Sequence, residues 1–476
     1  MRTIETVLQD IFNLKALRQN QVEIVHKIMD GEDVLVLLPT GAGKSLTFQL
    51  PMVVQNKKTI VISPLIALME DQVMQLKIKK IKACCIHSYL DLEDRQLILS
   101  QIDQFDFIYC SPEWLATNGM EYLKNYPCEA IVIDEAHCIS EWGFEFRPHY
   151  LCIDEVITYF NAQVIALTAT ANTQIIADIQ EVVKKDLVIL DFLTERDNIF
   201  LSVVKIESDN DKLDFIIDTL KTSGPTVIYF SSKKQVEAVY EALLSHHILA
   251  EHYHADMTYE NRMSVQQRYM QDEIQVICAT NAFGMGVNKS NIRTVIHYHM
   301  PKSIFQFIQE IGRGGRDGKL CQSILLYKQN DEQLSYRLNE MNELLIEEID
   351  LFYKGVQLPE EKHLLMNILS KKYNQNIIVQ KIKQHQNLKR QSTAMMLEYI
   401  QEKSCLNDCI NRFNQNTYNT EFKNHLTIRK NHNLRKCCMS CNDIYTISFE
   451  QVNYDVQKKF KKTLLNQLFN DLYDFT

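Results

Sequence analysis

The sequence predicts an α/β protein with two tandem domains, each built on a parallel β-sheet, followed by a helical C-terminal region. Short runs rich in Val and Ile alternate with amphipathic helical patterns up to residue 330, which is the rhythm of repeated strand–helix units. The runs are almost continuously apolar, as expected for parallel strands that are buried on both faces. Beyond residue 330 the strand pattern ends and helical periodicity replaces it.

The first domain is predicted over residues 1–195 and the second over residues 196–330. The expected strands are 33–38, 59–63, 106–110, 130–134 and 163–167 in the first domain, and 226–230, 274–278, 294–298 and 323–327 in the second. Residues 331–454 are expected to be mainly helical and to carry a cysteine cluster, with an extended, Asn-rich and basic loop at 411–436. Residues 455–476 are expected to form a C-terminal amphipathic helix.

The composition is that of a soluble globular protein. Hydrophobic residues make up 46% and charged residues 23% of the 476 positions, both ordinary values. No apolar run approaches the roughly 18–20 residues of a membrane span, and the N-terminus lacks the pattern of a signal peptide. The 13 cysteines are mostly scattered, which argues against a disulfide framework. We therefore expect a cytoplasmic protein with no membrane contact.

The charge is unevenly distributed along the chain. The net charge is −9, yet residues 371–462 carry 17 Lys and Arg against 7 Asp and Glu. A basic region on an acidic body is consistent with phosphate contacts to a nucleic acid. The alternative is that these lysines and arginines only form the solvated faces of exposed helices.

A phosphate-binding loop is predicted at residues 39–45, PTGAGKS, which follow the first strand and open a helical run. In this context the glycines let backbone N–H groups face the phosphates at the start of a helix. Lys44 would reach the β- and γ-phosphates, and the Ser45 hydroxyl would bind Mg²⁺. The residues expected to contact ATP in this loop are Thr40, Gly41, Ala42, Gly43, Lys44 and Ser45.

An acidic pair follows the strand 130–134 in the stretch DEAH, 134–137. Asp134 would hold Mg²⁺, and Glu135 would orient and deprotonate the attacking water. Aromatic residues and an arginine come directly afterwards, so a segment that can stack on bases adjoins one that can hydrolyse ATP. These residues are Trp142, Phe144, Phe146 and Arg147. The alternative is that the rings belong to the core.

Two arginines in the second domain stand three residues apart, Arg313 and Arg316, within the glycine-rich stretch 309–318. This spacing is one helical turn, so both guanidinium groups can face one polyphosphate. Such arginines can stabilise the charge of a transferring phosphoryl group. A glycine-rich loop with surface arginines is the alternative.

Taken together, these segments closely resemble the RecQ family of DNA helicases, within helicase superfamily two. The matching segments are RQNQ at 18–21, LLPTGAGKS at 37–45, SPLIALMEDQV at 63–73, YCSPEWL at 109–115, DEAHCISEWGFEFRPHY at 134–150, ALTATA at 166–171, VIYFSSKKQVE at 227–237, YHADM at 253–257, ATNAFGMGVNK at 279–289 and QEIGRGGRDG at 309–318.

The resemblance implies two RecA-like lobes with ATP and Mg²⁺ between them and single-stranded DNA across both. It assigns Arg18 and Gln21 to adenine recognition, Gln309 to the nucleotide site, and Thr280 to a DNA contact. Arg316 becomes the arginine finger, supported by Arg313. The family has an aromatic residue that stacks on the base where this chain has Leu14, which implies looser nucleotide selectivity.

The same resemblance identifies the loop after DEAH as the aromatic-rich loop of the family, in which Trp142, Phe144, Phe146 and Arg147 would contact DNA. Stacking on a base is worth about 1–3 kcal/mol for each ring. The rings could therefore hold DNA and signal its presence to Glu135.

A zinc site is predicted near the C-terminus, where the family carries a zinc module and four thiolates suit tetrahedral Zn²⁺. The chosen ligands are Cys405, Cys409, Cys438 and Cys441. The family pattern is incomplete because its last cysteine falls at Ile444. Cys437 and Asp443 remain alternative ligands, and a metal-free module remains an alternative state.

The function expected from these features is a DNA-dependent ATPase that moves 3′ to 5′ on single-stranded DNA and unwinds duplex in repair or recombination. Its expected partners are single-stranded, tailed or forked duplex DNA and a single-stranded-DNA-binding protein. Too few residues follow the cysteines for a winged-helix and a helical-bundle domain, so a short RecQ form is expected. The rival interpretations are an RNA helicase of the same superfamily and a strand-annealing or scaffold protein with a weak motor.

Overall fold

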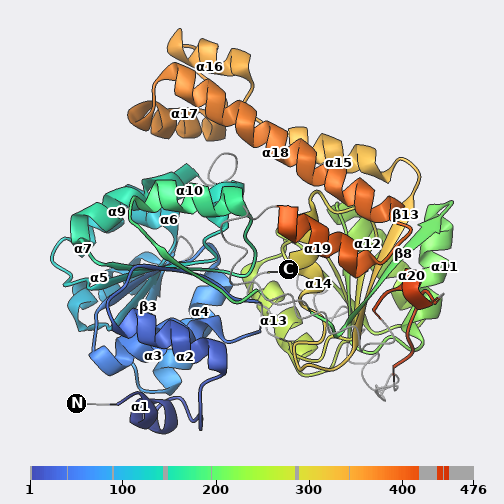
Figure 1. The fold of residues 1–476 in the computed structure, drawn as a ribbon, viewed down its shortest axis with the longest axis horizontal. Coiled ribbons are helices and arrows are strands. Elements are labelled where there is room, and N and C mark those ends of the chain that lie inside the picture. Colours follow the sequence, from blue (N-terminus) through green and yellow to red (C-terminus); the bar gives the residue numbers. More distant parts are fainter. Residues whose placement is uncertain are drawn as a thin grey trace, which may run out of the picture. The chain divides into compact units, whose positions relative to one another are not determined.

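The computed structural model describes residues 3–39, 41–87, 90–142, 148–193, 196–284, 289–341, 343–416, 437–442 and 444–449, without the side chains of 118, 141, 142 and 414–416. They form two compact units. Unit 1 is Met1–Thr194, Asn342–Leu388 and Asn416–Asn424, and unit 2 is Glu195–Met341, Lys389–Gln415 and His425–Thr476. Each unit is a β-sheet with helices on both faces (Figure 1). Each unit therefore combines one sheet-forming segment with part of the helical C-terminal region.

The sheet of unit 1 has seven parallel strands in the order β3-β4-β2-β5-β6-β1-β7. The strands are β1 (Val34–Leu37), β2 (Thr59–Ile62), β3 (Ala83–Ile86), β4 (Phe107–Cys110), β5 (Ala130–Asp134), β6 (Gln163–Thr168) and β7 (Val188–Asp191). Because every pair is parallel, the loops that leave the carboxyl ends of β1 and β5 lie at one edge of the sheet. That edge is where ligands bind in open α/β sheets.

Alternating strand residues divide the apolar core of unit 1 into two clusters, one on each face of the sheet. One cluster joins residues such as Val36 and Val132 to helices α1–α4, and the other joins Leu37 and Ile133 to α8–α10 and to α16–α18. The helices of unit 1 are α1 (Ile4–Asp10), α2 (Gln19–Met29), α3 (Lys44–Gln55), α4 (Ile66–Ile78), α5 (Leu92–Ser100), η1 (Ile102–Gln104), α6 (Pro112–Trp114), η2 (Leu115–Gly119), α7 (Met120–Leu123), α8 (Cys138–Trp142), η3 (Pro148–Cys152), α9 (Ile153–Phe160), α10 (Thr173–Val183), α16 (Ile346–Tyr353), α17 (Glu360–Lys372) and the first part of α18 (Gln375–Gln401).

Unit 2 has six parallel strands in the order β10-β11-β9-β12-β13-β8. The strands are β8 (Ile199–Ile206), β9 (Thr226–Tyr229), β10 (Ala250–Tyr253), β11 (Val276–Ala279), β12 (Thr294–His297) and β13 (Cys321–Lys328). Its helices are α11 (Asp209–Leu220), α12 (Lys233–Ser245), α13 (Tyr259–Met270), α14 (Ile304–Ile311), α15 (Asp331–Glu340), the last part of α18, α19 (Leu406–Asn416) and α20 (Met439–Asn442). The predicted α/β class with two parallel sheets is confirmed.

All nine predicted strands are present, with ends within two residues of the observed ones. Four further strands escaped the sequence analysis, namely β3, β7, β8 and β10. Each of them lies at an edge of its sheet. An edge strand has a neighbour on one side only and needs no continuous apolar run, as the sequence of β10, AEHY, illustrates.

The C-terminal region is helical, as predicted, but one of its segments differs. Residues 411–416 continue helix α19, where an extended loop was expected, because its apolar residues Leu406, Ile410 and Phe413 recur at helical spacing and pack in unit 2. The rest of that loop, 417–436, and the predicted helix 455–476 lie outside the described residues. Among the described helices, none is both long and apolar enough to cross a membrane.

A buried ion pair ties α15 to the core of unit 2. Lys212 on α11 is fully buried, and its Nζ lies 2.6 Å from Asp331 Oδ2 and 2.6 Å from the carbonyl oxygen of Tyr298. Burial lowers the pKa of Lys212, and the Asp331 carboxylate opposes this shift. A charge in such a place is tolerated only while its partner and its hydrogen bonds are present.

We expect Lys212→Ala to lower the free energy of unfolding of unit 2 by about 3–5 kcal/mol, because it leaves the Asp331 carboxylate buried without its cation. Chemical denaturation followed by far-UV circular dichroism measures the loss. Lys221→Ala is the matched control, because its partner Asp218 is 80% exposed in the side chain and such pairs are worth less than about 1 kcal/mol. Equal losses in the two variants would contradict the expectation.

Candidate nucleotide site and cysteine cluster

The loop between β1 and α3 is held in place by two residues of the N-terminal segment. Gln21 Nε2 donates a hydrogen bond to the carbonyl oxygen of Ala42 (2.9 Å), and Arg18 Nη1 donates to that of Gly41 (3.3 Å). Gly43 has a φ of 83°, and a Cβ at this position would lie 2.6 Å from Gln21 Nε2. Only glycine combines this backbone conformation with so close an approach. Arg18 and Gln21 therefore shape the loop itself.

Lys44 begins helix α3 directly after Gly43, and Ser45 follows it in the first turn, half-buried. The N–H groups of this turn have no partner within the helix, which makes the position suited to anionic phosphates. Thr40 lies outside the described residues. Leu14, which stands where the resemblance implies an aromatic ring, is 41% exposed and can give a base only an aliphatic contact.

The acidic pair lies at the carboxyl end of β5. Strand β6 lies between β5 and β1, so the two functional strands are separated by one strand and are not direct neighbours. Glu135 bends away from the sheet with a φ of 51°, a conformation that costs a residue with a side chain about 1–3 kcal/mol. The turn brings Glu135 Oε1 to 2.7 Å from Lys44 Nζ, with both side chains nearly buried.

Asp134 is buried beside this ion pair. Burial, followed by the negative charge of Glu135, raises the pKa of Asp134 to about 6, and the Lys44 ammonium opposes the shift. The backbone N–H of Glu135 donates to Asp134 Oδ1 (3.0 Å). A divalent cation near Asp134 would relieve the crowding of negative charge and favour the ionised carboxylate.

His137 connects the acidic pair to β6, a link that the sequence analysis did not assign. Its Nδ1 lies 2.9 Å from Thr168 Oγ1 and 3.4 Å from Glu135 Oε2. Thr168 Oγ1 in turn donates to the carbonyl oxygen of Thr170 (2.8 Å). Lys44, Glu135, His137 and Thr168 thus form one polar network in the first unit. The sequence held one signal for this link, the histidine of the DEAH motif. In the structure this histidine is 1% exposed.

The two arginines predicted to bind the polyphosphate, Arg313 and Arg316, follow helix α14. Arg313 is 4% exposed, and its Nη2 would lie 3.1 Å from a Cβ placed on Gly284. Arg316 is half-buried, and the charges of both arginines act on the Tyr229 hydroxyl. Gln309 is half-buried on α14.

Two residues at the start of unit 2 hold this glycine-rich turn, and the sequence analysis missed both. Arg196 Nη2 donates to the carbonyl oxygens of Gly314 (2.7 Å) and Gly315 (2.9 Å), and Asn198 Nδ2 also donates to that of Gly315 (2.8 Å). Because these bonds involve main-chain acceptors far along the chain, no local motif identified them.

Among the predicted DNA contacts, only Thr280 lies fully within the described part of the chain. It is half-buried after β11, and its backbone N–H donates to the carbonyl oxygen of Tyr253 (3.1 Å). Trp142 ends helix α8, but its side chain is outside the described set. Phe144, Phe146 and Arg147 are outside it altogether.

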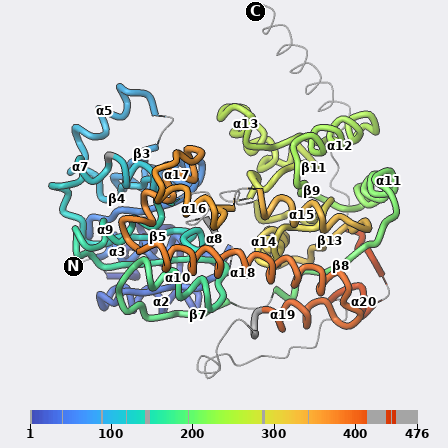
Figure 2. The backbone as a smooth tube through the Cα atoms, turned by 90° about the horizontal axis from the view of Figure 1, so that it is seen from above, coloured from blue at the N-terminus to red at the C-terminus, as the bar shows by residue number. Residues whose placement is uncertain are grey.

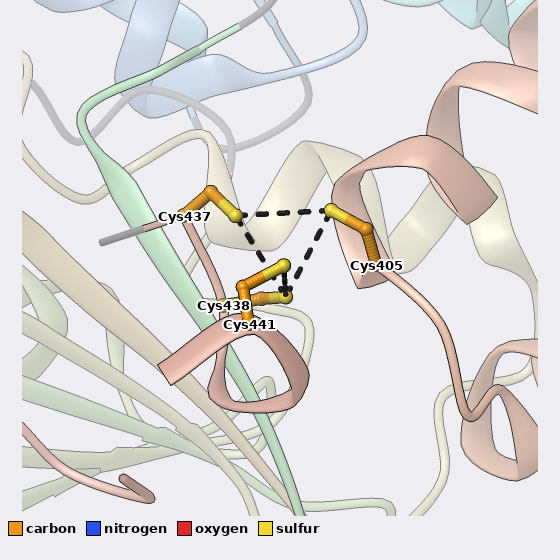
Figure 3. A group of neighbouring side chains, drawn as sticks. All are labelled: Cys405, Cys437, Cys438 and Cys441. Carbon is orange, nitrogen blue, oxygen red and sulfur yellow. Dashed lines mark hydrogen bonds between the residues drawn. The ribbon is translucent and has the colours of Figure 1, made fainter. Parts of the chain in front are cut away.

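Four cysteines gather in unit 2 (Figure 3). They are Cys405, Cys437, Cys438 and Cys441, and their Sγ atoms all lie within 4.8 Å of one another. The individual distances are 3.7 Å for Cys405–Cys437, 3.9 Å for both Cys437–Cys438 and Cys405–Cys438, and 3.5 Å for Cys438–Cys441. A tetrahedral site with Zn–S bonds of about 2.3 Å places sulfur atoms roughly 3.8 Å apart. The cluster therefore fits a tetrahedral metal ion.

The structure corrects one ligand of the predicted set: Cys437 takes the place of Cys409. Cys405 immediately precedes α19 and Cys409 lies within it. Cys409 is fully buried on the apolar face of α19, together with Leu406 and Phe413. The apolar spacing of these residues was the signal that assigns Cys409 to the core. Cys437 had been considered as an alternative ligand.

The cysteine segment also lies along strand β8. The backbone N–H of Leu201 donates to the carbonyl oxygen of Cys437 (3.2 Å), and Leu201 and Cys438 form a parallel bridge. Further along, Ser202 Oγ donates to the carbonyl oxygen of Tyr445 (2.6 Å). The cluster is thus attached to the edge of the sheet of unit 2.

Comparisons with known proteins agree with this geometry. The family model described as DEAD/DEAH box helicase matches residues 18–179, and the helicase conserved C-terminal domain matches residues 211–318. The "Probable ATP-dependent DNA helicase RecS" of Bacillus subtilis (strain 168) is 36% identical over 368 residues, which cover 76% of this chain and 74% of RecS. The chain belongs to the RecQ family of ATP-dependent DNA helicases. RecQ of Haemophilus influenzae is 38% identical over 69% of this chain and 54% of its own length.

Solved structures support the same fold. The DUF1998 helicase MrfA bound to DNA matches with a TM-score of 0.61 at 15% identity, covering 71% of this chain and 50% of MrfA. At this identity the likeness concerns the fold alone. The chain spans about half the length of RecQ and of MrfA.

The pKa of Asp134 is raised. On acidification, we therefore expect the affinity of this RecQ-family chain for Mg²⁺–nucleotide to decrease at a higher pH than it would with an aspartate of ordinary pKa. An ionised carboxylate is the form that would bind the cation, so we expect full affinity above about pH 7 and roughly tenfold weaker affinity at pH 5 for a pKa near 6. Titration with a fluorescent ADP analogue at constant free Mg²⁺ measures this profile. Glu135→Gln removes the neighbouring negative charge and should move the midpoint to lower pH; an unmoved midpoint would assign the titration to another group.

We expect the purified chain to contain about one zinc ion per molecule, because four thiolates at these distances suit Zn²⁺. Cys437→Ser should lose the metal, as measured by elemental analysis and by release into a chromogenic chelator. Cys409→Ala is the matched control and should keep it, since Cys409 lies in the apolar core. Zinc retained in the first variant, or lost from the second only, would restore the ligand set expected from the sequence.

Proposed function

We propose that this RecQ-family chain is a DNA-dependent ATPase that moves 3′ to 5′ on single-stranded DNA and unwinds duplex DNA during repair or recombination. The observation that carries the proposal is the buried network of Lys44, Glu135, His137 and Thr168 at the carboxyl edge of the sheet. It contains a cation and a carboxylate of the kind that nucleotide hydrolysis needs, with the buried Asp134 carboxylate beside them, and it lies in a chain related to ATP-dependent DNA helicases.

In the proposed reaction, the γ-phosphate of ATP displaces Glu135 from Lys44, because one ammonium group cannot serve both partners at full strength. Glu135 is then free to orient and deprotonate the attacking water. Asp134 and Ser45 would hold Mg²⁺, and the ion would supply charge neutralisation at the phosphates. The backbone around Thr40, Gly41, Ala42 and Gly43 cradles the phosphates, while Arg18 and Gln21 read the adenine.

Unit 2 would complete the reaction. Arg316 stabilises the charge on the transferring phosphoryl group, and Arg313 supports it from its buried position beside Gly284. Gln309 contributes to nucleotide binding. Thr280 and the segment with Trp142, Phe144, Phe146 and Arg147 grip the DNA strand, so that each ATP cycle alters the hold on DNA.

The four-cysteine cluster would hold zinc as a structural ion, since all four positions are occupied by protein ligands and none is open for substrate. Its ligands in this proposal are Cys405, Cys437, Cys438 and Cys441. A bound ion would fix α19 and α20 against strand β8, because the cysteines come from two segments that are distant in the sequence.

The decisive experiment compares unwinding of a duplex with a 3′ single-stranded tail and one with a 5′ tail. We expect ATP-dependent strand separation of the 3′-tailed duplex only, and at least about tenfold less with Lys44→Ala, which lacks the phosphate-binding ammonium. Matched RNA substrates test the RNA-helicase alternative. Strand pairing without ATP, together with no unwinding of either duplex, would favour the annealing alternative.

A further inference from the structure

Residues 346–388 form a helical arm on unit 1, consisting of α16, α17 and the first part of α18. The arm lies outside both matched helicase models, which end at residues 179 and 318. Figure 2 shows α16 and α17, in orange, on the side of unit 1 that carries α9 and α10. Leu365 and Leu369 of the arm belong to the same apolar cluster as Ile139 of α8 and Tyr150 of η3. The arm is therefore part of the core around the segment that follows DEAH.

The first polar attachment lies at η3 and α9, where the chain re-enters the described structure after residue 147. Lys372, the last residue of α17, donates from Nζ to the carbonyl oxygen of Leu151 and to Asp154 Oδ1. Lys372 is 17% and Asp154 9% exposed in the side chain, so water screens this pair poorly. Lys184 of α10 binds the other oxygen of the same carboxylate at 2.7 Å, but it is 66% exposed.

The second attachment reaches α8, which precedes residue 143. Ser140 Oγ donates to Asp178 Oδ2 on α10 (2.5 Å), and Gln174 Nε2 donates to Asp178 Oδ1 (2.6 Å). Gln384 of α18 donates from Nε2 to Gln174 Oε1 (3.0 Å). Four side chains thus connect the helix after DEAH to the arm.

The two attachments hold both flanks of residues 143–147, the segment to which DNA sensing is assigned above. In the sequence, this segment joins α8 on one side to η3 on the other. α8 begins three residues after Glu135, whose carboxylate binds Lys44. The flanks are therefore the only covalent route from the segment to the catalytic carboxylate and back to the sheet.

We propose that the helical arm contributes to the coupling between DNA binding and ATP hydrolysis. Lys372 and Ser140 are the positioning residues that hold the two flanks. The inference rests on the proposed function, because it presumes that DNA stimulates the ATPase. The arm does not touch ATP in this scheme. It sets the resting position from which DNA moves α8 and η3, so its loss changes the response to DNA and leaves basal hydrolysis intact.

The test compares Lys372→Ala and Ser140→Ala with Lys184→Ala in the full chain. Lys184→Ala is the matched control, because it removes the ion pair that the same Asp154 carboxylate makes with α10, a helix outside the arm. Basal ATPase, ATPase stimulated by an oligo-dT strand, and affinity for that strand by fluorescence anisotropy are measured for each variant. Lys372→Arg, which keeps the charge, serves as the conservative variant.

We expect the stimulated rate of Lys372→Ala and Ser140→Ala to fall by roughly 2- to 30-fold, the range for residues that carry coupling without touching a ligand. Basal rate and strand affinity should change by less than about twofold. Lys184→Ala and Lys372→Arg should resemble the unaltered protein. Thermal unfolding of each variant shows whether a loss reflects the fold.

Three results would overturn the inference: full stimulation in both Lys372→Ala and Ser140→Ala, an equal loss in Lys184→Ala, or a parallel loss of basal and stimulated rates. If Lys372→Ala does not fold, Ser140→Ala alone decides, since it removes one hydroxyl and leaves the packing in place. An unaltered protein that DNA does not stimulate would instead refute the proposed function, so the two failures are distinguishable.

Discussion

The ion pair between Lys44 and Glu135 is the interaction on which the site in unit 1 depends. The charged side chains of Lys44, Asp134 and Glu135 are withdrawn from water at the carboxyl edge of the sheet, and a buried charge is stable only with a partner. The P-loop supplies the cation because Gln21 and Arg18 hold its backbone. The turn at Glu135 supplies the carboxylate at the cost of a left-handed backbone conformation. Neither group would be well placed without the parallel sheet that aligns β1 and β5.

The structure extends outward from this pair through elements that serve two purposes. Helix α10 packs on the sheet through Ile175 and Ile179, and its polar side holds α8 through Asp178. The C-terminal region is likewise shared, because its helices complete the cores of both units and do not form a separate layer. A helicase core of this kind cannot be separated from the helices that follow it without exposing apolar surface such as Leu369 and Tyr399.

The sequence was sufficient for the central strands, the P-loop and the acidic pair, because each is a local pattern with a direct physical cause. It was insufficient where the cause is non-local. The edge strands β3, β7, β8 and β10 owe their conformation to a single neighbour, and Arg196 recognises carbonyl groups more than a hundred residues away. The cysteine cluster illustrates both cases. Sequence spacing identified Cys438 and Cys441 as ligands, whereas the choice between Cys409 and Cys437 depended on which face of α19 packs against the core.

The attachment of the cysteine segment to β8 has a consequence for self-association of the chain. Strand β8 is the last strand of its sheet, and an open strand edge offers unpaired N–H and C=O groups to any other extended chain. Cys437, Cys438 and Tyr445 occupy part of that edge through backbone and side-chain hydrogen bonds and a parallel bridge. If a metal ion holds the four cysteines together, it also keeps this edge covered. Oxidation or loss of metal would then favour self-association through β8, so the cluster would protect solubility as well as shape.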